Sequence, residues 1–280
     1  PGDVKPSIEG AVIECLLNPG VFTYKGRTGL LMRVAERMEQ RAGYVSTLVA
    51  DENSSTGTRL VEFALDDPKL SYEDPRVFSY DHCPYLTTLS HLRLAWSDDG
   101  VNFEVDESPT LQGMGELETF GIEDCRVTEM DGVYYLSYSA VSENGVGVGL
   151  QTTRDWITFE PQGMIFPPHN KDCTLFTEKI AGQYAALHRP VGADVGGPFM
   201  WYSTSPDLKH WGNHRCIART RPGKWDSGRI GAGAAPIRTD KGWLEIYHAS
   251  DHQSRYCLGA MLLDLDDPGK VIARSDSPIM

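Results

Sequence analysis

The sequence lacks any long hydrophobic segment. No stretch of its 280 residues approaches the roughly 18 consecutive apolar residues of a membrane-spanning helix, so we expect a soluble protein without a transmembrane segment. The first residues, Pro1-Gly2-Asp3-Val4-Lys5, do not form a signal peptide. The absence of an initiator methionine suggests a trimmed or partial chain.

Positive charge is scarce. The 26 lysines and arginines face 39 aspartates and glutamates, which gives a net charge of −13. Nucleic acids and anionic membranes both require a basic face on a protein that binds them, so we expect neither as a partner. Hydrophobic residues make up 40% of the chain, which is enough for a sizeable buried core and excludes wholesale disorder.

Clustered metal ligands are absent as well. Six cysteines are widely separated and form no Cys-x-x-Cys pair: Cys15, Cys83, Cys125, Cys173, Cys216 and Cys257. Metal sites and compact disulfide frameworks need clustered cysteines, so we expect buried free thiols and a cytoplasmic location.

The pattern His210-x-x-x-His214 flanks Trp211 in a predicted turn without a third ligand nearby. We therefore expect no metal site.

Helical periodicity is hard to find. The best candidate is 31–39, and even that segment fits a strand followed by a turn. Short runs rich in Val, Ile, Tyr, Leu and Thr, such as 134–139 and 146–153, lie between turn residues that recur about every 8–12 positions. Such runs are typical of antiparallel strands, so the sequence predicts an all-β fold.

An internal repeat organises these strands. Glu73-Asp74-Pro75-Arg76-Val77 recurs fifty residues later as Glu123-Asp124-Cys125-Arg126-Val127. Three acidic turns ending in an aromatic residue recur with a similar period: 97–103, 153–159 and 205–211, with Asp99, Asp155 and Asp207 lying 56 and 52 residues apart. Four short strands per unit of about 50 residues match a propeller blade. We expect five to six units in one domain over 1–280, each turn being an outer hairpin whose Asp accepts backbone N–H groups and whose aromatic residue packs between blades.

The repeated Glu-Asp-x-Arg motif is a candidate for chemistry. Acidic side chains followed by Arg at a strand start are unusual as core residues, because buried charges need partners. For Asp74 and Arg76, an ion pair that holds a turn and a functional role remain equally open. For Asp124, the apolar neighbours Phe120-Gly121-Ile122 favour function, because an apolar environment raises the pKa of a carboxyl group, as a general acid requires.

Further sequence motifs, together with the Glu-Asp-x-Arg motif, match those of a known protein family. The chain resembles glycoside hydrolase family 130, the five-bladed propellers that include the β-mannoside phosphorylases. The resemblance runs from about residue 10 to the end of the chain. It rests on these motifs: Asn18-Pro19-Gly20, Leu30-Leu31-Met32-Arg33-Val34, Tyr85 to Leu94, Gly121 to Thr128, Asn170-Lys171-Asp172, His188-Arg189-Pro190, Trp225-Asp226-Ser227, Gly231-Ala232-Gly233 and Gly242-Trp243 through Tyr247-His248.

The resemblance implies a reaction and a role for each matching residue. Asp124 would be the general acid, its proton passing through a sugar hydroxyl. Inorganic phosphate would be bound by Arg33, Lys171, Arg189 and His248. The mannose ring would be held by Asn18, Asp172 and Asp226. The implied reaction is inverting phosphorolysis of a β-mannoside to α-mannose 1-phosphate, without a cofactor, and the segment 86–92 leans towards β-1,2-linked substrates. A homo-oligomer is compatible with the resemblance.

Physical chemistry supports a phosphorylase independently. An inverting hydrolase needs a second carboxylate to activate water, whereas phosphate arrives already anionic and needs cations to position it. Arginine offers bidentate contacts and lysine a point charge. Three cations and a histidine at one site would make that site positively charged in a protein whose net charge is −13.

Two features depart from the family pattern. Cys125 stands where the family usually has Pro, so the backbone beside the acid loses a fixed φ angle. The chain also stops at Met280, before a last segment with another glycine-rich strand and a sugar-contacting Asp, so the last blade could be incomplete.

Two other functions remain open. A β-mannosidase of the same family would need a base, for which Glu245 is the best candidate, although strand alternation places it on the face opposite to His248. The second alternative is a propeller that binds saccharides without cleaving them. Cys125 and the end of the chain at Met280 favour this alternative. The presence of Asp124 and of the cations that would bind phosphate opposes it.

Overall fold

The computed structural model describes residues 2, 4–192 and 195–280. All regular structure in these residues is β strand, which confirms the all-β expectation. Most of the segment 31–39 lies in strand β2 (Arg27–Met38), which pairs with strands on both sides and in which Leu31 and Val34 are fully buried. No helix that could cross a membrane is found in the described part of the chain.

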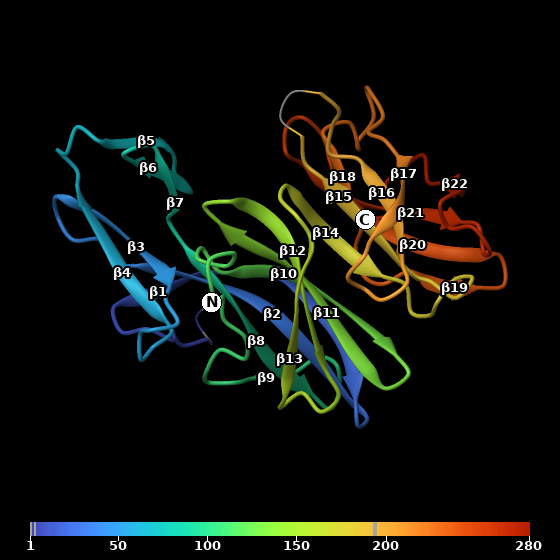
Figure 1. Ribbon diagram of the computed structural model, residues 1–280, viewed down its shortest axis with the longest axis horizontal. Coiled ribbons are helices and arrows are strands. Elements are labelled where there is room, and N and C mark those ends of the chain that lie inside the picture. The colour runs from blue at the N-terminus through green and yellow to red at the C-terminus, as the bar shows by residue number, and fades with distance from the viewer. Residues whose placement is uncertain (1, 3, 193–194) are drawn as a thin grey trace. The chain divides into compact units, whose positions relative to one another are not determined.

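The chain divides into two compact units, one formed by 1–125 and 140–145, the other by 126–139 and 146–280. The main sheet of the first unit has the order β1-β2-β8-β9 (Figure 1). Its other strands are β1 (Ala11–Tyr24), β8 (Leu89–Ser97) and β9 (Glu104–Val105). Strand β2 pairs with β8 without interruption from Thr28↔Ser97 to Glu36↔Leu89. This unbroken register fixes which residues of β2 and β8 lie side by side.

Five short strands lie between β2 and β8 in the sequence. They form the hairpin β3 (Tyr44–Ala50) and β4 (Thr58–Ala64), and a small sheet of β5 (Leu70–Asp74), β6 (Val77–Tyr80) and β7 (Cys83–Leu86). Aromatic rings hold this insert together: Phe63 stacks on Tyr80 at 4.1 Å between centroids, and Phe78 stacks on Tyr85 at 5.4 Å. Leu48 of β3 packs against Ala11 and Leu89 of the main sheet.

A second four-stranded sheet has the order β10-β11-β12-β13. Its strands are β10 (Ile122–Met130), β11 (Val133–Ser142), β12 (Gly145–Thr153) and β13 (Phe159–Phe166). The boundary between the two units runs through β10 and β11, so that Asp124 belongs to the first unit and Arg126 to the second.

The second unit contains two more sheets. One consists of β14 (Asn170–Leu175), β15 (Tyr184–Pro190), β16 (Met200–Ser205) and β17 (Gly212–Ala218), in that order. The other consists of β18 (Arg229–Gly231), β19 (Ile237–Thr239), β20 (Gly242–Ser250), β21 (Tyr256–Leu263) and β22 (Val271–Arg274). Leu187, Met200, Trp243 and Met261 from both sheets are fully buried in one hydrophobic core. That core fixes β15 and β20 against each other.

The predicted acidic turns connect the last two strands of their sheets. In each, one carboxylate oxygen accepts hydrogen bonds from the backbone N–H groups two and three residues later, as predicted for Asp99, Asp155 and Asp207. Asp264 makes the same two bonds between β21 and β22, a fourth copy that the sequence comparison missed. The period of about fifty residues therefore corresponds to one antiparallel sheet.

The aromatic residues of these turns follow the prediction in part. Trp211 contacts Phe166 of the preceding sheet at 5.0 Å, as expected for a residue between sheets. Phe159, which ends the second turn, contacts Trp156 of the same turn, with 6.4 Å between ring centroids.

The number of sheets differs from the five or six units that were predicted. Within 4–192 and 195–280, four sheets have four or more strands, because the first copy of the Glu-Asp-x-Arg repeat lies in the three-stranded sheet of the insert. The last of these four sheets holds five strands.

The six cysteines are free, as predicted. Only Cys125 and Cys173 are buried, however, and Cys83 is exposed.

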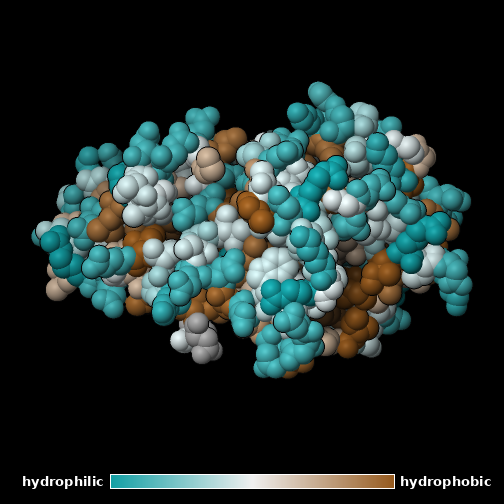
Figure 2. All heavy atoms as spheres, turned by 90° about the horizontal axis from the view of Figure 1, so that it is seen from below, coloured by the Kyte–Doolittle hydropathy of each residue, from teal (hydrophilic) through white to brown (hydrophobic). Residues whose placement is uncertain are grey.

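Polar residues cover most of the face drawn in Figure 2, and apolar residues form separate patches on it.

Candidate functional site

In the first unit, two predicted site residues meet around the carboxylate of Asp124. Asn18 donates from Nδ2 to Oδ1 of Asp124 over 2.9 Å, and Nη1 of Arg33 lies 3.2 Å from the same oxygen. Asn18 sits at an irregularity in the pairing of β1 with β2 and has φ +41°. Asparagine tolerates this left-handed conformation better than most residues, which explains why the Asn18-Pro19-Gly20 segment can turn its amide towards Asp124.

Close backbone packing brings Asp124 to Arg33. Gly121 forms a bridge with Ser90 of β8, and a Cβ atom at Gly121 would lie 2.3 Å from the carbonyl oxygen of Ser90. Only glycine allows this approach, and Gly121 has φ +91°. Arg33 in turn donates from Nε to Oγ of Ser90 over 3.0 Å. Ser90 therefore ties the start of β10 to the guanidinium group.

The surroundings of Asp124 differ from the apolar environment that the sequence predicts. Phe120 and Ile122 are indeed buried. The carboxylate itself, however, contacts an amide donor and a guanidinium group, which both stabilise its ionised form. Arg33 also forms an ion pair with Glu123, so one arginine serves two adjacent carboxylates.

The first copy of the motif has a structural role. Asp74 accepts hydrogen bonds from the backbone N–H and from the guanidinium group of Arg76, on the surface of the small β5–β7 sheet. The hydrogen bonds from Arg76 lower the pKa of Asp74 to about 2. Of the two roles left open for this pair, the ion pair that holds a turn is the one observed.

In the second unit, three further predicted residues meet around Asp172. Oδ2 of this carboxylate lies 2.5 Å from Nη1 of Arg189 on β15 and 3.1 Å from Nε2 of His248 on β20. Lys171 stands directly opposite Arg189 in the pairing of β14 with β15. The structure thus brings Lys171, Asp172, Arg189 and His248 together on three strands.

The electrostatics of this cluster are dominated by Asp172. Burial alone would raise the pKa of its carboxyl group. The hydrogen bond to His248 and the charges of Arg189, His248 and Arg126 outweigh that effect and hold the pKa well below its usual range. Asp172 is therefore ionised at neutral pH and provides the negative charge that the buried Arg189 requires.

A glycine makes room for the cluster. Gly231 pairs with His248 in the register of β18 and β20. A Cβ atom at this position would lie 2.2 Å from Oδ2 of Asp172 and 2.7 Å from the imidazole of His248. The absence of a side chain at Gly231 thus lets the backbone of β18 lie close to side chains of the site.

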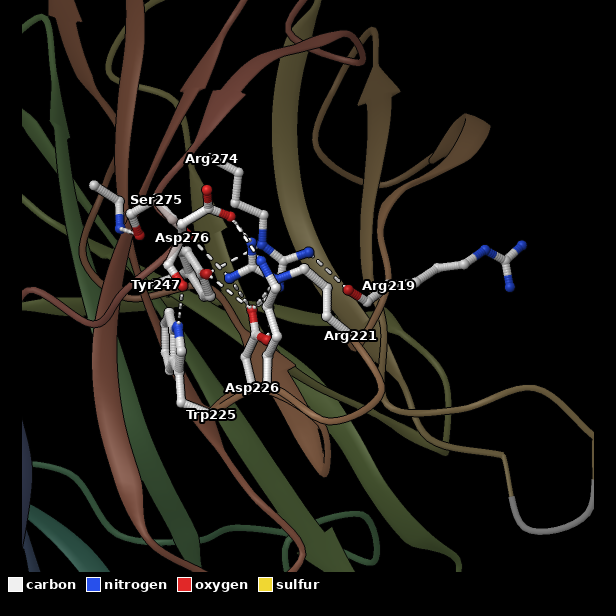
Figure 3. Close-up of polar contacts among 10 residues, drawn as sticks. Arg219, Arg221, Trp225, Asp226, Tyr247, Arg274, Ser275 and Asp276 are labelled. Atoms are coloured by element: carbon white, nitrogen blue, oxygen red, sulfur yellow. Dashed lines mark hydrogen bonds and ion pairs between the residues drawn. The ribbon is translucent and has the colours of Figure 1, made fainter.

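Asp226 belongs to a different cluster, shown in Figure 3. Its fully buried carboxylate contacts Arg221 at 2.8 Å and Arg274 at 2.5 Å, and it accepts a hydrogen bond from the Tyr247 hydroxyl over 3.2 Å. Tyr247 and His248 are adjacent on β20, so their side chains point to opposite faces of the sheet. Asp226 is therefore on the other side of β20 from His248; its predicted role as a sugar ligand stays a prediction, and its contacts favour a structural role.

Glu245 shares this opposite face of β20. It is fully buried, and Oε1 accepts a hydrogen bond from the backbone N–H of Gly233 over 2.8 Å. Burial raises the pKa of Glu245 to about 8, although the Gly233 hydrogen bond and the charge of Arg126 act in the opposite direction. The alternation predicted for this strand is confirmed.

The two histidines of the His210-x-x-x-His214 pattern serve separate purposes. His210 lies in the exposed third turn, where its Nδ1 is 2.7 Å from the carboxylate of Asp207. The His214 ring packs against Phe166 and His188. Among the residues that the structure describes, no three His, Cys, Asp or Glu side chains are grouped as metal ligands would be.

Comparison with known proteins identifies the family. The family model for glycoside hydrolase family 130, described as β-1,4-mannooligosaccharide phosphorylase, matches residues 77–280. The chain belongs to glycoside hydrolase family 130.

Two relatives of the chain are named as phosphorylases. Over its whole length the chain is 44% identical to a β-1,2-mannobiose phosphorylase of Listeria innocua, of which it covers 80%. It is 41% identical to a 1,2-β-oligomannan phosphorylase of a Thermoanaerobacter species, over 71% of the chain and 66% of that relative, just under two thirds of its length. The solved structure of the Listeria enzyme with β-1,2-mannobiose superposes with a TM-score of 0.93.

Three residues of this family 130 site escaped the sequence analysis. Ser90 and Glu123 both bind the guanidinium group of Arg33, and Arg126 acts electrostatically on Asp172 and Glu245. Each stands inside or next to a family 130 motif. Their function depends on contacts between residues distant in the sequence, however, and only the recurrence of Glu123 and Arg126 in the Glu-Asp-x-Arg motif gave a signal.

Proposed function

We propose that this protein catalyses the inverting phosphorolysis of β-mannosides, with β-1,2-linked manno-oligosaccharides as preferred substrates. The family and the relatives named above support this reaction. The observation that carries it is the contact of Arg189 and His248 with Asp172, with Lys171 opposite Arg189 in the strand pairing, because basic residues gathered in a protein of net charge −13 fit an anionic co-substrate. Inorganic phosphate is that co-substrate.

The proposed reaction needs a nucleophile, which is phosphate, and a general acid, which is Asp124. An oxygen atom of phosphate attacks the anomeric carbon of the mannosyl residue from the face opposite to the glycosidic oxygen, and the carbon–oxygen bond to the leaving sugar breaks. Asp124 supplies the proton that this sugar needs, through a hydroxyl of the substrate. The products are α-mannose 1-phosphate and a saccharide that is one residue shorter.

Separate sets of residues bind the phosphate and the mannose ring in this proposal. Arg189, Lys171, His248 and Arg33 hold phosphate, since guanidinium groups make bidentate contacts with its oxygens and the ammonium group adds a point charge. Asn18 holds the mannose ring. Its contact with Oδ1 of Asp124 would keep the acid beside the sugar.

The position of Glu245 argues against hydrolysis. A base that activates water must reach the reaction centre, about 6.5–9.5 Å from the acid. Glu245 is fully buried on the face of β20 opposite to His248 and binds backbone. A protein that only binds saccharides would not need Asp124 and the cation cluster together.

Three further expectations belong to this proposal. The four sheets are blades of a propeller of the five-bladed kind that the family resemblance implies, in one catalytic domain. The enzyme acts in the cytoplasm, where phosphate and sugar phosphates are retained. It uses no metal or cofactor, and self-association into a homo-oligomer is compatible with it.

The decisive experiment compares cleavage with and without phosphate. The protein is incubated with β-1,2-mannobiose and β-1,4-mannobiose, each with phosphate, without phosphate and with EDTA. We expect mannose 1-phosphate from the β-1,2-linked substrate only when phosphate is present, unchanged by EDTA, and in the α configuration by NMR. Equal release of free mannose without phosphate would establish a hydrolase instead.

A further inference from the structure

Asp172 contacts the predicted phosphate ligands and is shielded from solvent. Its Oδ2 lies 2.5 Å from Arg189 and 3.1 Å from His248, and this atom has less than 1 Å² of accessible surface. A sugar hydroxyl could reach Oδ2 only if one of these side chains moved away. The contacts thus differ from those expected of the sugar ligand that the family resemblance implies.

The backbone holds this carboxylate in place. Asp172 has φ +51° and lies at the irregularity between Lys171 and Thr174 in the pairing of β14 with β15. Gly231 lies against the carboxylate and the imidazole on the other side, where a Cβ atom would overlap both. Such a conformation, unfavourable for aspartate, persists only when the surroundings enforce it.

We infer that Asp172 is a positioning residue of the phosphate subsite, which fixes the Arg189 guanidinium and the His248 imidazole before phosphate binds. This inference rests on the proposed phosphorolysis and names a further residue for it. A side chain that is already oriented loses less conformational freedom when its ligand arrives, so the affinity for phosphate is higher.

His248 contacts both members of the ion pair through one atom. Its Nε2 lies 3.1 Å from Oδ2 of Asp172 and 3.4 Å from Nη1 of Arg189. The carboxylate therefore orients the imidazole as well as the guanidinium group, as carboxylates orient histidines beside bound metal ions.

Neighbouring charges explain why a carboxylate is tolerated next to an anion site. Arg189 on β15, His248 on β20 and Arg126 on β10 all stabilise the ionised Asp172. Lys171 adds a positive charge on the same strand. Asp172 balances part of this charge while phosphate is absent, which removes the cost of several buried cations without a counter-ion.

The test is the variant Asp172→Asn, which keeps the size of the side chain and removes its charge. We expect the KM for phosphate to rise at least about tenfold, as for the loss of one charge-assisted hydrogen bond, and the KM for β-1,2-mannobiose to change less than about threefold. Thermal stabilisation by phosphate without sugar should fall in parallel, at constant ionic strength set with chloride. A rise in the KM for mannobiose with an unchanged KM for phosphate would make Asp172 a sugar ligand and overturn the inference.

Asp226→Asn is the matched control. Asp226 is likewise buried between arginines, but on the other face of β20, so this variant should lower the melting temperature and leave the KM for phosphate unchanged. If both variants change the KM for phosphate equally, a general loss of packing is responsible and the inference fails.

A measurement on the unaltered enzyme covers the case in which Asp172→Asn does not fold. Crystal structures of the wild type without and with bound phosphate should show the Arg189 guanidinium and the His248 imidazole in the same positions against Asp172. Movement of either group away from Asp172 on phosphate binding would contradict the inference. Absence of phosphate-dependent cleavage by the wild type would instead refute the proposed function, while the phosphate-free structure would still report on Asp172, Arg189 and His248.

Discussion

Nη1 of Arg33 lies 3.2 Å from Oδ1 of Asp124, so a predicted phosphate ligand and the predicted general acid form an ion pair. Asn18 of β1 donates to the same oxygen over 2.9 Å. Residues of β1 and β2 therefore hold the carboxylate of the proposed general acid.

Asp124→Asn removes the acid with little change in volume. We expect kcat to fall by roughly 10²–10⁴-fold with a preserved fold, the usual effect of losing general acid catalysis. Steady-state kinetics of the phosphorolysis measure this effect. Asp74→Asn is the matched control, because it alters the same motif in an exposed turn and should leave kcat unchanged. Activity within a few-fold of wild type in Asp124→Asn would assign the acid to another residue.

Arg189→Ala tests the phosphate ligand directly. Loss of its charge-assisted contacts should raise the KM for phosphate at least about tenfold and change the KM for the saccharide much less. The melting temperature should fall as well, because the buried Asp172 loses its nearest cation. Arg189→Lys keeps the charge but not the planar guanidinium geometry, so we expect an intermediate KM. A variant that loses stability but keeps its KM for phosphate would show that Arg189 is only structural.

Asp226→Asn should act on stability alone. The carboxylate is buried between Arg221 and Arg274, and removal of one partner from such a group costs about 3 kcal/mol in the free energy of unfolding. Urea unfolding measures this loss. Asp276→Asn, at the exposed end of the same network in Figure 3, should cost much less. An altered KM for the saccharide without a loss of stability would instead support Asp226 as a sugar ligand.

Glu245 should make stability depend on pH. Its pKa is raised to about 8 in the folded state, from about 4.5 in an unfolded chain, so the folded state binds more protons between these values. Stability therefore falls as pH rises from about 4.5 to about 8. Glu245→Gln removes this titration, and its melting temperature relative to wild type should increase over that range. A difference that does not change with pH would refute the assignment, and loss of activity in this variant would revive the hydrolase.

Local patterns in the sequence predicted much of the fold. The turns at Asp99, Asp155 and Asp207 were recognised because Asp bonds to nearby backbone N–H groups wherever it occurs in this turn. The turn at Asp264 was missed because Leu262 replaces the preceding Ser or Thr and no aromatic residue follows. Similar sequences also misled: Asp74 ends the first strand of the three-stranded sheet in the insert, whereas Asp124 lies at the start of a four-stranded sheet.

The candidate site was predictable as a set of residues but not as an arrangement. The resemblance named Asp172 and Arg189, which lie on adjacent strands, yet it assigned them to different ligands. Their ion pair, and the contact of both with His248, depend on packing between β15 and β20, which no local pattern encodes.

Gly231 sets a limit on sequence variation in this protein. A single added carbon atom would overlap the Asp172 carboxylate and the His248 ring, both of which are held by other contacts. In a library of all substitutions at this position, selection for activity should recover glycine alone. At Gly212, where an added Cβ atom would meet no other atom within 4 Å, many amino acids should survive the same selection.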